Sequence, residues 1–373
     1  MLSNNRNENG FDFLRLFAAV CVVVQHAIAH LEASFFWLDT GESYWFWDGV
    51  PLFFILSGLL VYQSCEKCVS SGRPIWQYFA NRLLRIAPAI YAYVLITITL
   101  LLVIGILSTK EIFSVSFFAW FLSNIFLVPV YHPIIYEGFG VGVVNGSLWT
   151  IPVEFGFYTF IPVLFFLETK YGFKKMIIFV VVVSLFGECI KWLLIINPLE
   201  TLAEKLFLVT FIPHLLYFGI GIFWLRTWRS VKHSPVLAAL AAWFYIVIRY
   251  DILQMKNFLG PFYEFAWALP LSYAVIWFGY NAPIFFLKVT KLGDYSYGIY
   301  IWHMVVINTL MTFQFTDKYP NLPGTIVHFI VLLFTLLMAM FSWWIIEKPT
   351  MKFKPFSSRD QEKKQNRVFR QVR

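Results

Sequence analysis

The chain has 373 residues, of which 59% are hydrophobic and only 13% are charged, and its mean hydropathy is +0.68. Because soluble domains carry about 25% charged residues, this composition excludes a soluble enzyme and indicates a polytopic membrane protein. The net charge of +8 follows the membrane topology described below, so we expect no binding of nucleic acid.

Apolar windows of about twenty residues predict ten membrane-spanning helices. A further apolar stretch near 116–130 is too short to cross a bilayer, and we interpret it as a re-entrant or interfacial segment. The predicted fold class is therefore an all-α polytopic bundle, with residues 1–350 forming one transmembrane domain. The ten predicted spans are 11–31, 46–64, 86–108, 148–168, 174–194, 206–226, 235–250, 264–281, 294–313 and 325–346.

Lysine and arginine are distributed unequally between alternate loops. If the N-terminus is cytoplasmic, 22 of these residues fall on the inner side and 5 on the outer side. Cytoplasmic loops are enriched in Lys and Arg, so both termini are expected in the cytoplasm. Residues 351–373 are predicted to form a basic cytoplasmic tail that lies against anionic membrane lipids.

The first predicted span contains Asp12, Arg15 and His26. Ionisable groups inside a span are costly and usually functional. At about 100° per residue, Arg15 and His26 project from the same face of the helix, about 16 Å apart along its axis. This spacing predicts a polar track along one side of the helix. Alternatively, Arg15 extends to the near membrane surface and His26 bonds a backbone carbonyl.

Glu154 is predicted at the same membrane depth as His26, in the outer third of the bilayer. An imidazole and a carboxylate at one level could pair, which would orient the ring and raise its basicity, as in a general base. The alternative is that Glu154 neutralises another buried cation.

Arg82 and Arg85 precede the third predicted span and, at positions i and i+3, share one helical face. Two guanidinium groups on one face suit a bidentate grip on phosphate. The alternative is ordinary anchoring by positive residues at the cytoplasmic surface. Glu347, at the cytoplasmic end of the last span, is expected to hold these arginines in place.

The ninth predicted span begins with Asp294 and Ser296, which could cap the helix. It also contains His303 near the middle of the membrane, where a lone histidine more often has a structural role. The sequence has no Walker loop, no HExxH and no GxSxG motif. Its one CxxC pair, Cys65 and Cys68, is a weak metal signal, and we expect no metal site.

Taken together, these motifs resemble the acyltransferase-3 family of membrane enzymes, which acylate cell-surface sugars. The resemblance covers nearly the whole chain. At 153–158, however, the chain has the sequence VEFGFY where family members commonly have VEEQFY, which leaves the preference for an acceptor open. The motifs are Arg15 with His26, Phe53–Gly58, Arg82 with Arg85, Ser147–Tyr158, Ser296–His303 and Ile346–Pro349.

The resemblance implies an O-acyltransferase in the inner membrane of a bacterium. Its donor would be cytoplasmic acyl-CoA, with acetyl-CoA expected. Its acceptor would be a hydroxyl of a cell-envelope or exported polysaccharide (O-antigen, capsule or exopolysaccharide) or of its lipid-linked precursor. No permanently bound cofactor is expected.

The resemblance also implies roles for individual residues. Arg15 and His26 would be required for activity, and Arg82 and Arg85, with Arg15, would serve the CoA side. We expect His26, oriented by Glu154, to take the proton of the acceptor hydroxyl, and a covalent acyl-histidine relay stays open as a variant. The remaining site residues are Tyr158, Trp149, His303 and Ser296 for substrate contact, and Asp12 and Glu347 for support.

Two other classes of protein fit the same polar track. One is a transporter or flippase for an anionic substrate or a glycolipid, with Arg15 and His26 along its pathway. The other is a membrane sensor or binding protein that has kept the fold without the chemistry. The absence of an evident internal repeat with matched broken helices weighs against a secondary transporter.

Overall fold

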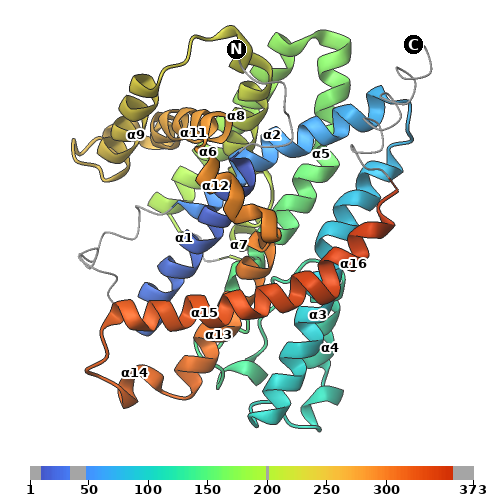
Figure 1. Ribbon diagram of the computed structural model, residues 1–373, viewed down its shortest axis with the longest axis vertical. Coiled ribbons are helices and arrows are strands. Elements are labelled where there is room, and N and C mark those ends of the chain that lie inside the picture. Colours follow the sequence, from blue (N-terminus) through green and yellow to red (C-terminus); the bar gives the residue numbers. More distant parts are fainter. Residues whose placement is uncertain (1–9, 34–47, 199–200, 356–373) are drawn as a thin grey trace.

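The computed structural model describes residues 10–33, 48–198 and 201–355, and these residues form helices and connecting segments without a β-strand. Most of the predicted basic tail, residues 356–373, lies outside the described residues. Figure 1 shows the arrangement of the helices. The helices are α1 (Phe11–Leu31), α2 (Gly49–Ser70), α3 (Trp76–Val103), α4 (Val115–Ile125), α5 (Thr150–Tyr171), α6 (Phe173–Ile196), α7 (Leu202–Leu208), α8 (Leu215–Thr227), α9 (Pro235–Arg249), α10 (Lys256–Leu259), α11 (Tyr263–Asn281), α12 (Ile284–Val289), α13 (Ser296–Thr312), α14 (Phe315–Lys318), α15 (Gly324–Ser342) and α16 (Lys348–Thr350).

Nine of the ten predicted spans correspond to one α-helix each and the span 206–226 corresponds to the pair α7 and α8, which confirms the all-α polytopic fold class. Among the described residues, six helices are long and apolar enough to cross a membrane: α1, α2, α3, α5, α6 and α15. The pair α7 and α8, bent by 42°, makes up to seven. The other three predicted spans are α9, α11 and α13, which do not meet this test. Twelve of the 17 residues of α13 are buried among other helices, so this helix needs less apolar surface than one that faces lipid.

The third predicted span begins ten residues too late. We predicted 86–108, whereas α3 begins at Trp76, passes through Pro88 and ends at Val103. A hydropathy window avoids Arg82 and Arg85, but the helix accommodates both because their guanidinium groups find polar partners inside the bundle. Both arginines are thus part of a spanning helix rather than of the approach to it.

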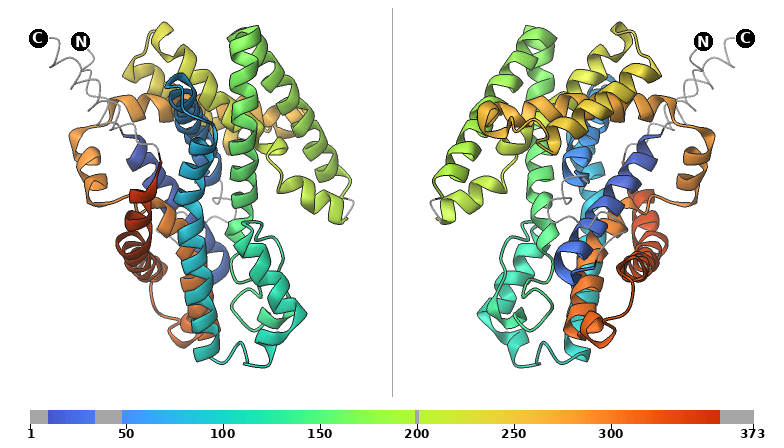
Figure 2. Two further views of the ribbon diagram at one scale, coloured as in Figure 1. Left: turned by 90° about the vertical axis from the view of Figure 1, so that its right-hand side faces the viewer. Right: turned by 90° about the vertical axis from the view of Figure 1, so that its left-hand side faces the viewer.

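The short apolar segment predicted near 116–130 contains α4, which has 11 residues and begins where Ser114 Oγ accepts a hydrogen bond from the backbone N–H of Phe117 at 3.1 Å. A non-helical stretch with two 3₁₀ turns leads from α4 to α5. Asn308 of α13 anchors this stretch by donating from Nδ2 to the carbonyls of Val143 and Val144, at 2.9 and 3.1 Å. Figure 2 shows this teal segment at the lower end of the molecule.

Helix α1 packs against α2, α13 and α15, which brings its polar face into the bundle. Helices α2 and α8 cross closely at two glycines. A Cβ atom at Gly58 would collide with the carbonyl oxygen of Phe218, and one at Gly221 with that of Ile55. Small residues let two helix backbones approach in this way. The crossing fixes α2, whose next turn lines the site described below.

Candidate active site

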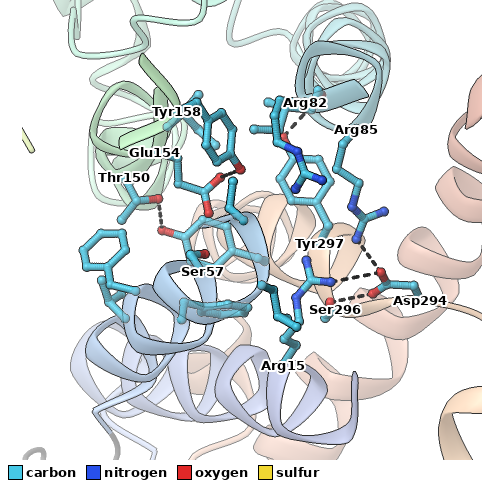
Figure 3. Close-up of a pocket in the computed structure, with 18 of the residues that line it drawn as sticks. Arg15, Ser57, Arg82, Arg85, Thr150, Glu154, Tyr158, Asp294, Ser296 and Tyr297 are labelled. Atoms are coloured by element: carbon cyan, nitrogen blue, oxygen red, sulfur yellow. Dashed lines mark hydrogen bonds and ion pairs between the residues drawn. The ribbon is translucent and has the colours of Figure 1, made fainter. Parts of the chain in front are cut away.

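A cavity of about 300 Å³ lies between α1, α2, α3, α5 and α13. Loop residue Asp294 and the segment that follows α16 complete its wall. Figure 3 shows that the polar side chains of these five helices point toward one another across the cavity. The charged and polar lining residues are Arg15, Ser57, Arg82, Arg85, Thr150, Glu154, Tyr158, Asp294, Ser296, Tyr297, Tyr300 and Lys354.

Asp294 joins two helices at one side of this cavity. Its Oδ2 accepts from Nη2 of Arg85 at 2.7 Å and from Nη1 of Arg15 at 3.3 Å, and its Oδ1 accepts from the Ser296 hydroxyl at 2.7 Å. Burial alone would raise the pKa of Asp294, but Arg85 and Arg15 outweigh it and hold that pKa well below its ordinary value. Asp294 is therefore an ionised anchor for both arginines.

Arg85 has a second acidic partner. Its Nη1 donates to Oε2 of Glu347 at 3.2 Å, and the Ser342 hydroxyl donates to Oε1 of Glu347 at 3.0 Å. Glu347 ends a π-helical turn, Trp343–Glu347, between α15 and α16. Turns of this kind often occur at functional sites. The turn places the Glu347 carboxylate, of which only 3% is exposed, against a largely buried guanidinium.

Arg82 and Glu154 face the cavity from opposite walls. Arg82 donates from Nη2 to the Ser64 hydroxyl at 3.1 Å, and its guanidinium lies 5.9 Å from the centre of the Tyr158 ring. Glu154 accepts a hydrogen bond from the Tyr158 hydroxyl at 3.2 Å. The cavity therefore has hydrogen-bond donors and acceptors as well as positive charge (Figure 3).

The hydrogen-bond partner of His26 is His303 of α13, with 2.8 Å between His26 Nδ1 and His303 Nε2. His303 Nδ1 lies 2.8 Å from the carbonyl oxygen of Tyr300, which can only accept, so Nδ1 of His303 carries the proton. In the neutral ring Nε2 is then an acceptor, and His26 must donate to it from Nδ1. This leaves Nε2 of His26 as the unprotonated, basic nitrogen.

The predicted pairing of His26 with Glu154 therefore does not occur in the structure. The depth estimate treated α5 as a helix that starts at the membrane surface, but a loop and a 3₁₀ turn precede it. Helix α13 packs directly on α1 and supplies the partner instead. Neither His26 nor His303 lines the cavity. Tyr300 connects the two places, because its side chain lines the cavity while its carbonyl holds His303.

The structure thus divides the predicted site residues between several locations. Trp149 does not line the cavity and packs against the ring of His214, with 5.1 Å between ring centres. Asp12 lines a small neighbouring pocket together with Asp294 and Ser296. Glu347 touches the site through Arg85. The predicted residues that line the main cavity are Arg15, Arg82, Arg85, Glu154, Tyr158 and Ser296.

Sequence reasoning missed six polar lining residues: Ser57, Thr150, Asp294, Tyr297, Tyr300 and Lys354. We interpreted Asp294 as a helix cap, although an acid that precedes a buried helix and lies near Arg15 in depth was a usable signal. Ser57 lies in Phe53–Gly58, a stretch used above only as a motif of the resemblance and given no role in the site. Lys354 was counted among the charges of the tail, and nothing in the sequence distinguishes it from the neighbouring lysines.

Comparison with known proteins agrees with this architecture. The family described as "Acyltransferase domain", the acyltransferase-3 family, matches residues 8–347. This chain belongs to the acyltransferase-3 family. It is accordingly a membrane acyltransferase, and the match includes every predicted site residue. No solved structure matches the chain.

Several curated relatives resemble this acyltransferase. Nodulation protein 10 of Rhizobium leguminosarum bv. viciae is 29% identical over 93% of this chain and 94% of its own length. Peptidoglycan O-acetyltransferase OatA of Listeria monocytogenes serovar 1/2a is 24% identical over 91% of this chain. O-acetyltransferase OatA of Staphylococcus aureus (strain MRSA252) is 25% identical over 95%. The match covers only 55% and 59% of these two longer relatives.

Proposed function

We propose that this acyltransferase moves an acetyl group from acyl-CoA to a hydroxyl of a carbohydrate. The observation that carries the proposal is the excess of positive charge in one cavity, where four cationic side chains, Arg15, Arg82, Arg85 and Lys354, meet two carboxylates, Glu154 and Asp294. Acyl-CoA bears several phosphates, and arginine binds phosphate through strong, charge-assisted hydrogen bonds. Acyl-CoA therefore fits the positive charge of the cavity, and as an acyl donor it fits the reaction of the acyltransferase family.

Beyond the arginines, the cavity suits the rest of the donor. The pantetheine arm of CoA contains two amides, which need both donors and acceptors. The hydroxyls of Ser57, Thr150, Tyr158 and Tyr300 and the carboxylate of Glu154 supply them. Arg15 and His26 lie about 16 Å apart along α1, and in the donor the same arm separates the phosphates from the thioester.

His26 supplies the base in the proposed reaction. Its Nε2 takes the proton of the acceptor hydroxyl as the oxygen attacks the thioester carbonyl carbon. The carbon–sulfur bond then breaks, and the departing CoA sulfur receives the proton from the imidazolium. The products are a carbohydrate ester and free CoA. His303, held by the Tyr300 carbonyl, fixes the ring nitrogen that acts.

The acceptor class and the membrane orientation are part of the same proposal. We propose a cell-envelope or exported polysaccharide, or its lipid-linked precursor, because two relatives are named as O-acetyltransferases and one of these as acting on peptidoglycan. The 22 to 5 distribution of Lys and Arg supports cytoplasmic termini, with the donor entering from the cytoplasm and the enzyme in the inner membrane.

Mass spectrometry of envelope polysaccharides tests this function in cells. Cells with the gene should contain acetylated sugars that are absent from cells without it. Cells that produce the His26→Ala protein at normal membrane levels should match the cells without the gene. If the polysaccharides carry the same acetyl groups in all three, the proposed function is wrong.

A further inference from the structure

The cavity contains four cationic side chains, and two of them are already neutralised. Arg85 uses Nη1 for Glu347 and Nη2 for Asp294. Arg15 uses Nη1 for Asp294. A guanidinium held between two carboxylates has little charge left for a ligand, and moving it would leave buried carboxylates without partners. Arg85 is thus better suited to hold the walls of the cavity together than to grip a substrate.

The other two cations, Arg82 and Lys354, have no carboxylate partner among residues 10–33, 48–198 and 201–355. In the part of the chain that the structure describes, no carboxylate forms an ion pair with either residue. Arg82 donates a hydrogen bond from Nη2 to the neutral Ser64 hydroxyl, and its buried Nε has no hydrogen-bond partner among the described residues. A buried, unpartnered donor of a charged group is costly unless a ligand satisfies it.

Lys354 is held at the cavity by the backbone around it. It follows a short 3₁₀ turn, Met351–Phe353, whose Met351 also lines the cavity. The carbonyl of the next residue, Pro355, accepts a hydrogen bond from Nη1 of Arg73 at 3.2 Å. Arg73 lies in the turn between α2 and α3, so both sides of Lys354 are fixed. The family match ends at residue 347, so membership of the family assigns no role to Lys354.

We propose that Lys354 and Arg82 together bind a phosphate group of the acyl-CoA, while Arg85 positions the cavity wall. The inference rests on the proposed function and sharpens it, because it names which cations touch the donor. The phosphate oxygens would accept from Arg82 and from the Lys354 ammonium and would neutralise these two charges, with which no carboxylate of the described residues forms an ion pair.

Direct binding of CoA to the purified protein, measured by calorimetry at pH 7, tests this assignment. Lys354→Met should weaken binding by about tenfold to a hundredfold, the value of a hydrogen bond to a charged group. Lys352→Met is the matched control, because Lys352 is exposed, lies two residues away and does not line the cavity. Equal affinities of the two variants would overturn the inference.

The pH dependence of CoA binding gives a second readout. Burial, and then the positive charges of Arg85 and Arg82, lower the pKa of Lys354 to about 8. CoA affinity should therefore fall between pH 7 and pH 9 in the wild type and fall less in Lys354→Arg, whose guanidinium stays charged. The other groups at the site are the same in both proteins: Arg15, Arg82, Arg85, Glu154, Tyr158, Asp294, Tyr297 and Glu347.

The outcomes separate this inference from the proposed function. A wild-type protein that binds no CoA at pH 7 would refute both. A wild-type protein that binds CoA with the same pH profile as Lys354→Arg would refute only the role of Lys354. This comparison also decides the matter if Lys354→Met does not fold.

Discussion

Replacing His303 with Phe isolates the part of the mechanism that concerns the proton. The substitution keeps a ring in a fully buried position but removes the acceptor that fixes the proton on Nδ1 of His26. A net hydrogen bond is worth about 1 kcal/mol, so kcat should fall about fivefold. His26→Ala, which removes the proposed base itself, should lower kcat by about 10² to 10⁴. KM for acyl-CoA should stay constant in both variants, because neither residue lines the cavity.

The assay follows the release of the CoA thiol at saturating acceptor, with thermal unfolding of each variant as a control for folding. Glu154→Gln is the informative comparison, since the sequence alone predicted Glu154 as the partner of His26. We expect Glu154→Gln to change KM for acyl-CoA, because Glu154 lines the cavity in which we propose that the donor binds. The role given to His303 would be refuted if His303→Phe kept the wild-type kcat while Glu154→Gln had a fivefold lower kcat and an unchanged KM.

Three further predictions concern stability and are measured by unfolding of the purified protein in detergent. The pKa of Asp294 is depressed in the folded protein, so its ion pairs stabilise the fold fully above about pH 4 and lose that contribution as pH falls further. Asp294→Asn should therefore lower the free energy of unfolding by about 1–3 kcal/mol at pH 7, and the difference in stability from wild type should be smaller below pH 4. A difference in stability that does not depend on pH would contradict this expectation. Arg249 binds Asp48 through two hydrogen bonds of 2.6 and 2.8 Å. Arg249→Met should lower the free energy of unfolding by about 3 kcal/mol. The double variant Arg249→Met with Asp48→Asn should lose less stability than the two single variants lose together, whereas additive losses would show that the pair does not interact. Gly58→Ala should lower the free energy of unfolding by about 1–3 kcal/mol, because the added methyl group forces α2 and α8 apart. Gly138→Ala is the control and should change stability little, because its Cβ would lie 3.5 Å from its nearest neighbour. Equal losses of stability in the two variants would contradict the close crossing of α2 and α8.

The sequence predicted the helices well because lipid imposes one simple rule. A span must satisfy its backbone hydrogen bonds internally and present apolar side chains, so hydropathy alone located all ten segments. The same rule misplaced the start of α3, because Arg82 and Arg85 are tolerated inside the bundle by polar partners outside α3. Glu347, which contacts Arg85, is 262 positions away along the chain.

The site was predicted only where helix periodicity was enough. The common face of Arg82 and Arg85 and the polar face of α1 follow from 3.6 residues per turn. The partner of His26 does not, because it depends on which helix packs against α1. The position of Lys354 at the cavity could not be predicted from the sequence either, since it depends on a turn held by a hydrogen bond from Arg73.

The most direct test of the whole account is transfer of label by the protein in liposomes. The vesicles receive acetyl-CoA labelled in the acetyl group, together with polysaccharide from the source cells as acceptor. The proposed function predicts label on the carbohydrate as a base-labile ester, formed by the wild type and not by His26→Ala. Carbohydrate or lipid-linked carbohydrate that crosses the membrane without gaining label would contradict it and would favour a transporter.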